Sequence, residues 1–200
     1  MKKLLIFSYT LILVIISSCG SDAPETDNKQ EIKANMSDYS EFQLINLGKY
    51  ELNAKIMIPD ASANIGASTK PEIIHNDSFL WKITAGPKFE LHIEDFGDYK
   101  DRMVNKKKEL KEQNKFFQIK YLIDEPHLIL YERKLIVKGD KNAAPEVGVD
   151  HITYHVYGEK ILDGITYELR SRDEGFGADQ KNIAELMVKT IKSFNSLDKQ

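Results

Sequence analysis

Hydrophobic and polar residues alternate along several stretches of the chain. The first clear case is Tyr50, Leu52, Ala54, Ile56 and Ile58, which are separated by single, mostly polar residues. A period of two is typical of a strand that buries one face. The same pattern predicts further strands at residues 79–84, 89–94, 117–123, 127–137, 151–157 and 161–170, with a turn near Gly158 between the last two.

Two other stretches have helical spacing. Residues 98–115 are rich in Lys and Glu and carry a thin apolar stripe. Residues 183–194 carry a clear apolar stripe, and Asp179 could cap the N-terminus of the helix they form. The links between strands are mostly short, which favours antiparallel pairing. The pattern therefore predicts an α+β fold, in which a mainly antiparallel sheet of about seven or eight strands is covered by a middle helix and a C-terminal helix.

The N-terminus has the features of an export signal. Lys2 and Lys3 precede an apolar run, residues 4–16, which is shorter than the roughly 20 residues that span a membrane. The following Ile-Ser-Ser-Cys, ending at Cys19, resembles the lipobox of bacterial lipoproteins. That resemblance implies cleavage before Cys19 and its acylation, which would anchor the protein to a membrane. An ordinary signal peptide with a free cysteine and an uncleaved anchor helix are the alternatives.

Composition indicates how the chain is divided into a signal, a tether and a folded domain. Cys19 is the only cysteine, so the folded part has no intramolecular disulfide. Residues 20–40 are polar, and we expect residues 1–18 to be a signal peptide, 19–40 the lipidated cysteine and a flexible tether, and 41–197 one α+β domain. Removal of the signal takes two lysines and moves the formal charge from −3 to −5, which argues against a nucleic-acid partner.

The order of the predicted elements carries a second resemblance. An early strand runs into a loop at 59–60, a hairpin at 79–94 precedes a charged helix, and a hairpin at 151–170 leads into the closing helix 183–194. This order is similar to the Mog1/PsbP-like fold, although the single tryptophan, Trp81, lies later than that pattern would place one. The resemblance implies a sandwich whose relatives mostly act as binding or assembly factors, and it brings no active site.

Few residues of the sequence suggest chemistry. There is no Gly-x-Ser-x-Gly, P-loop or Gly-x-Gly-x-x-Gly motif, and we expect no catalytic residue, metal or cofactor. His151 and His155 share one face of a predicted strand, but their Cα atoms would lie about 13 Å apart, too far to bind one ion directly. With His92 and Tyr157 they are the candidate ligand-binding residues of a polar sheet face.

The sequence thus favours a noncatalytic binding or assembly module of the bacterial cell envelope. Its partners would be the membrane, through the lipid on Cys19, and an envelope protein. Gly20 after the cysteine favours the outer membrane in a Gram-negative host. Two alternatives stay open: an envelope hydrolase or metal-dependent enzyme that uses His and carboxylate groups of the polar sheet face, and a carrier whose pocket lies between sheet and helix.

Overall fold

The computed structural model describes residues 36–66, 70–115, 117–135, 152–172 and 180–197. The described residues all belong to one compact unit, residues 35–200. Its strands are β1 (Phe42–Asn46), β2 (Ala54–Pro59), β3 (Glu72–Asp77), β4 (Leu80–Ala85), β5 (Phe89–Asp95), β6 (Phe117–Asp124), β7 (Leu128–Leu135), β8 (Ile152–Leu162), β9 (Ile165–Ser171) and β10 (Asn195–Ser196). Its helices are α2 (Arg102–Glu112), α3 (Lys181–Ser193) and the short 3-10 helices η1 (Met36–Tyr39), η2 (Gly48–Tyr50), η3 (Ala61–Ala63) and η4 (Gln113–Lys115).

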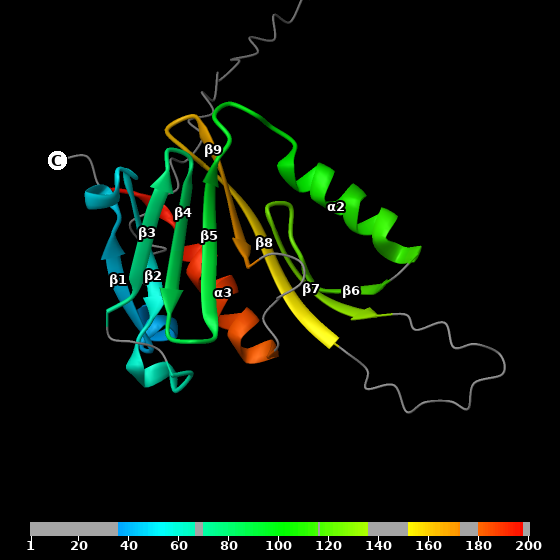
Figure 1. The fold of residues 1–200 in the computed structure, drawn as a ribbon, viewed down its shortest axis with the longest axis horizontal. Coiled ribbons are helices and arrows are strands. Elements are labelled where there is room, and N and C mark those ends of the chain that lie inside the picture. Colours follow the sequence, from blue (N-terminus) through cyan, green and yellow to red (C-terminus); the bar gives the residue numbers. More distant parts are fainter. Residues whose placement is uncertain (1–35, 67–69, 116, 136–151, 173–179, 198–200) are drawn as a thin grey trace, which may run out of the picture. The chain divides into compact units, whose positions relative to one another are not determined.

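Seven of the strands form one sheet, in the order β3-β4-β5-β9-β8-β7-β6 (Figure 1). The other three form a smaller sheet, β1-β2-β10, and both sheets are antiparallel throughout. The predicted α+β class with a mainly antiparallel sheet and two covering helices is confirmed. None of the helices in the described part of the chain is long and apolar enough to cross a membrane.

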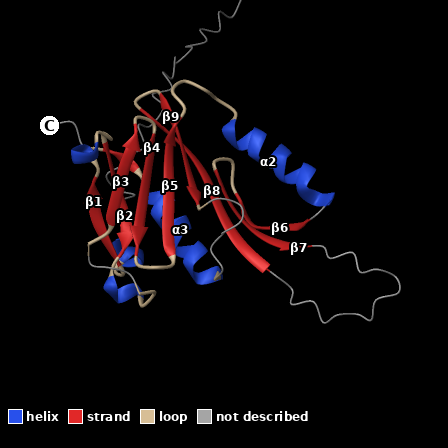
Figure 2. Cartoon of the chain, in the orientation of Figure 1, coloured by secondary structure: helices blue, strands red, loops and turns tan. Residues whose placement is uncertain are grey.

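The two faces of the large sheet are covered differently, because successive side chains of a strand point to opposite faces. Val156 and Leu169 belong to the main core, together with Ile58 of β2 and Ile191 of α3. The small sheet and α3 therefore cover one face, and α3 passes behind β5 in Figure 2. Burial of apolar area at about 25 cal/mol per Å² makes this layer the principal source of stability.

Helix α2 lies on the other face of the large sheet. Its two buried residues, Met103 and Leu110, pack against Ile129, Tyr131 and Tyr157 of β7 and β8. This is the thin apolar stripe that the sequence predicts. The helix begins later than expected, at Arg102, because Asp101 has a left-handed backbone (φ 69°) that cannot continue a helix.

The predicted turn near Gly158 is wrong. β8 continues through Gly158 to Leu162, and the turn is made by Asp163 and Gly164, whose φ angles are 50° and 85°. Gly158 is small for another reason: a Cβ there would lie 2.5 Å from Cγ2 of Ile191 in α3. The first predicted strand corresponds to β2 and begins later than predicted, at Ala54, because η2 and a left-handed Glu51 precede it; β1 was not predicted.

Candidate functional site

A cavity of about 270 Å³ opens between α2 and the α2-facing side of β7, β8 and β9. Helix α2 supplies polar side chains on one side, and the strands supply aromatic and charged side chains on the other. The lining residues are Arg102, Asn105, Lys106, Glu109, Tyr131, His155, Val156, Tyr157, Glu168, Arg170, Ser171 and Arg172. Four of these residues are cationic and two are carboxylates, so the wall carries an excess of positive charge.

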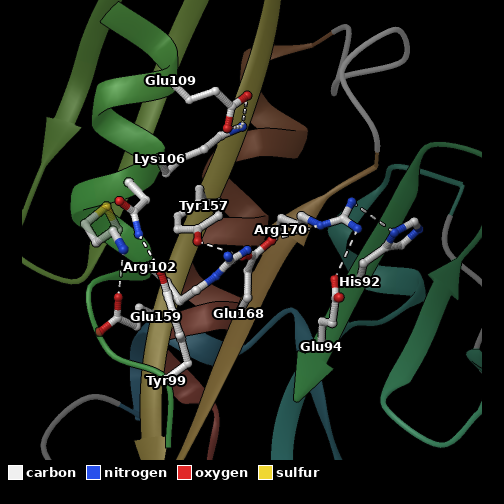
Figure 3. A network of polar contacts seen from close by, with 12 residues as sticks. His92, Glu94, Tyr99, Arg102, Lys106, Glu109, Tyr157, Glu159, Glu168 and Arg170 are labelled. Carbon is white, nitrogen blue, oxygen red and sulfur yellow. Dashed lines mark hydrogen bonds and ion pairs between the residues drawn. The ribbon is translucent and has the colours of Figure 1, made fainter. Parts of the chain in front are cut away.

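Glu168 holds the charged groups of this wall together (Figure 3). It is 4% exposed, and its Oε2 accepts hydrogen bonds from Arg102 Nε at 3.0 Å and from the Tyr157 hydroxyl at 2.7 Å. Arg102 Nη2 also contacts Oε2, and Arg170 Nε lies 3.1 Å from Oε1. A buried carboxylate is tolerated when it is paired and hydrogen-bonded. Both oxygens of Glu168 are therefore occupied by donors.

The tyrosine in this cluster is held in its neutral form. Burial raises the pKa of Tyr157 well above its ordinary value, and the adjacent charge of Glu168 raises it further. Burial alone would lower the pKa of Arg102, but its hydrogen bond to Glu168 and the charge of that carboxylate outweigh burial and raise it. Around neutral pH the cluster therefore consists of a neutral hydroxyl donor, a guanidinium and the carboxylate they share.

A second buried carboxylate fixes the start of α2. Glu159, which is 7% exposed, accepts a hydrogen bond at Oε2 from the backbone N–H of Met103 at 2.8 Å. The first N–H groups of a helix have no partner within it, and a negative charge there is favourable. No side chain next to α2 in sequence caps it, so a residue of β8 does. Glu159 thereby positions the helix over the cavity.

The polar network continues past the cavity onto β5 and β4. Arg170 Nη1 lies 3.4 Å from Nδ1 of His92, whose Nε2 lies 2.9 Å from Oε1 of Glu90. Glu90 also pairs with Lys82 at 3.0 Å, and Glu94 lies 3.6 Å from Arg170 Nη2. An arginine can only donate, so Nδ1 of His92 accepts and Nε2 carries the proton.

The histidine of the cavity wall has a different environment. His155 is 3% exposed, and its Nε2 lies 2.8 Å from the Thr153 hydroxyl. Its ring stacks on Tyr131, with centroids 5.2 Å apart and planes 15° from parallel. Stacking and burial make these two rings an aromatic floor for the cavity.

The structure brings some of the predicted site residues together. His155 and Tyr157 of β8 point to the face of the sheet that α2 covers, and both line the cavity. His92 lies on the same sheet face, two strands away, and is linked to Tyr157 through Arg170 and Glu168. Cys19 and His151 lie outside the described residues.

Arg102, Glu168 and Arg170 were not predicted as site residues. A signal for two of them was present, because Thr166, Glu168 and Arg170 alternate with apolar residues in a predicted strand. Such alternation puts their side chains on one face, but it does not show which residues lie opposite. Among the described residues, no three His, Cys, Asp or Glu side chains are placed to hold a metal ion.

Comparisons with known proteins give one structural likeness. No family model matches the chain, and no curated protein is similar to it. A similar solved structure is that of the Saccharomyces cerevisiae Ran-binding protein Mog1p, with a TM-score of 0.42 and 8% sequence identity, covering 78% of this chain and 96% of that one.

Proposed function

We propose that this chain is an exported lipoprotein that binds a ligand, without transforming it, in the cavity between α2 and the sheet. Cys19 and the apolar run before it support export and a lipid anchor. The binding role rests on one observation: the cavity is lined by polar groups that already hold one another in place. In this proposal the protein belongs to the cell envelope, on the outer membrane of a Gram-negative host.

The state of these groups favours binding over catalysis. A general base needs a free lone pair near the substrate, and a nucleophile needs to be activated. Glu168 is occupied by two arginines and Tyr157, and burial raises the pKa of Tyr157, which keeps it protonated. His155 is held by Thr153. These side chains act as fixed donors and acceptors, which is what recognition of a ligand requires.

The anchor is tested by replacing the cysteine. In a bacterium that processes lipoproteins, we expect the full chain in the membrane fraction, with an N-terminal peptide that starts at Cys19 and carries acyl chains in its mass spectrum. Cys19→Ser should leave the chain soluble or mislocalised with an unchanged melting temperature. Membrane attachment that survives Cys19→Ser, or an unmodified Cys19, would disprove the lipid anchor.

The binding role is tested by filling the cavity. Asn105 is exposed on α2 and lines the cavity, so Asn105→Trp should occupy it without unfolding the helix. Native mass spectrometry of the full chain, released gently from membranes, should show a bound small molecule that Asn105→Trp loses. Val104→Trp is the matched control, because Val104 is the adjacent residue, is 64% exposed and does not line the cavity.

Two results would reject this function. If the same mass spectrum is obtained with both tryptophan variants, the cavity is not the binding site. If the released molecule is chemically altered by the protein in a reaction that Asn105→Trp abolishes, the envelope enzyme is the correct reading.

A further inference from the structure

We propose that the ligand of this cavity is a small organic anion, bound through its carboxylate or phosphate group by Arg172. This inference rests on the proposed binding function and names the chemical class of the ligand. Three observations carry it: the charge of the wall, the ion pairs within it, and the size and floor of the cavity.

The ion pairs within the cavity wall do not neutralise all of its positive charge. Glu168 is shared by Arg102 and Arg170, and Glu109 pairs with Lys106 at 3.1 Å. Arg172, by contrast, makes no ion pair with any described residue. From outside the cavity, Glu94 contributes a longer contact to Arg170, at 3.6 Å. Partly buried positive charge in a confined space attracts a complementary anion, because field lines are concentrated there.

The geometry suits an oxyanion in particular. Arg172 directly follows Ser171, the last residue of β9, and lines the cavity together with Arg170. A guanidinium presents a planar fork of N–H groups that binds a carboxylate or a phosphate in a bidentate manner. Because Glu168 already occupies Arg102 and the Nε edge of Arg170, Arg172 is the fork available to a ligand.

The size and floor of the cavity limit the rest of the molecule. At about 270 Å³ it is slightly smaller than typical ligand pockets, which range over roughly 300–1,000 Å³. The stacked Tyr131 and His155 rings and the ring of Tyr157 form its floor. A short dicarboxylate or a small phosphate ester fits this description: one anionic group at Arg172, and a compact body over the rings.

The experiment uses the acylated full chain in nanodiscs of neutral phosphatidylcholine. Succinate, glycerol 3-phosphate and inorganic phosphate are titrated by calorimetry, with succinamide and glycerol as uncharged analogues. We expect one of the organic anions to bind with a 1:1 stoichiometry, with an affinity that falls as salt is raised. The uncharged analogues should bind at least about tenfold more weakly.

Variants separate this site from general attraction to positive charge. Arg172→Gln should weaken binding by about tenfold or more, whereas Arg172→Lys should recover part of the affinity because it keeps the charge without the fork. Lys107→Gln is the control: like Arg172→Gln it removes one positive charge, but Lys107 lies on α2 and does not line the cavity. If Arg172→Gln fails to fold by circular dichroism, Asn105→Trp gives the same test by blocking the cavity.

Each other outcome overturns the anion assignment. Equal weakening by Arg172→Gln and Lys107→Gln would indicate nonspecific attraction, and equal binding of charged and uncharged analogues would exclude an oxyanion site. In a second set of nanodiscs that also contain phosphatidylglycerol, binding of that lipid without binding of any free anion would identify a lipid headgroup instead. If no anion binds but native mass spectrometry still shows a molecule that Asn105→Trp loses, the binding function stands and its ligand is not an anion.

Discussion

At the scale of single residues, the candidate site pairs three neighbouring glutamates of the sheet with positively charged or N–H donor groups. The register of β5, β9 and β8 sets Glu94, Glu168 and Glu159 directly opposite one another across three strands. Like charges at such positions are destabilising. Each glutamate has a partner: Arg170 is shared by Glu94 and Glu168, Arg102 also pairs with Glu168, and the first turn of α2 donates to Glu159. The arginines and the helix are therefore structural requirements of this sheet as well as parts of the cavity.

Removal of one hydroxyl tests this arrangement. Tyr157→Phe deletes the O–H that donates to Glu168 at 2.7 Å and leaves the ring in place. A lost hydrogen bond to a buried charged group should lower the free energy of unfolding by about 1.5–3 kcal/mol. Urea denaturation measures the change. Tyr154→Phe, on the same strand with the opposite facing, is the control and should change it by less than about 0.5 kcal/mol. Equal effects would contradict a special role for the Tyr157 hydroxyl.

Glu90 gives a prediction about pH. Burial alone would raise the pKa of Glu90, but hydrogen bonds from Lys82 and His92 outweigh it and lower the pKa below the ordinary value of 4.5. A carboxylate with a lowered folded-state pKa stabilises the fold above the unfolded-state pKa, and this contribution is lost as the pH falls through the folded-state value. We therefore expect Glu90→Gln to be less stable than the wild type above about pH 4.5, and the difference to shrink in more acidic solution.

Thermal unfolding followed by circular dichroism, repeated across the acidic range, measures this difference. Glu72→Gln is the matched control, because Glu72 is exposed on β3, which is separated from the strand of Glu90 by β4. A stability difference for Glu90→Gln that stays constant with pH would show that the effect is one of packing rather than of titration.

At the scale of elements, the close approach of β8 and α3 depends on one missing side chain. A Cβ at position 158 would lie 2.5 Å from Cγ2 of Ile191 and 3.4 Å from Cδ1 of Leu128. Gly158→Ala should therefore lower the free energy of unfolding by about 1–3 kcal/mol through overpacking. Ile191→Ala alone should cost about 2–5 kcal/mol because it leaves a cavity.

Combining the two substitutions tests the cause. In the Ile191→Ala background the added methyl of Gly158→Ala has space, so the double variant should be more stable than the sum of the two single effects predicts. A double-mutant cycle by urea denaturation measures this coupling. Strictly additive effects would mean that Gly158 is required for its backbone and not for the contact with α3.

The sequence predicts elements better than it predicts their ends and partners. Alternation and helical spacing are local, so most strands of the large sheet and both helices are recovered. The turn predicted at Gly158 is wrong because glycine is a common turn signal. Here the glycine is needed for the close approach of α3, which is distant in sequence. β10 is two residues long and exists only through its pairing with β2, so no local pattern could indicate it. Glu168 and Arg170 likewise become a site only through the register of three strands.

At the scale of the whole folded unit, the main core and the cavity lie on opposite faces of the large sheet. The main core lies between that sheet and the layer of α3 and the small sheet, whereas the cavity lies under α2, which buries only Met103 and Leu110. Substitutions in the cavity can therefore change binding with a limited effect on the core. The same separation explains how a sheet face that carries three glutamates is tolerated.

The N-terminal limit of this unit gives the last prediction. The expected domain began at residue 41, but η1 is tied to α3: the Tyr39 hydroxyl donates to the Lys189 carbonyl at 3.1 Å, and Lys189 Nζ donates to the Asp38 carbonyl at 3.1 Å. Tyr39 also packs edge-on against Phe42, with ring centroids 5.3 Å apart. A chain that starts at residue 35 keeps these contacts, and one that starts at residue 41 loses them.

We expect the chain from residue 35 to melt at the temperature of the unlipidated full chain, and the chain from residue 41 to melt lower. Two hydrogen bonds and one aromatic contact are worth about 1–3 kcal/mol together, which corresponds to a decrease of roughly 2–10 °C for a unit of this size. Tyr39→Phe in the longer chain isolates one hydrogen bond and should give a small part of that decrease. Equal melting of the two shortened chains would place the boundary at residue 41 and make η1 part of the tether.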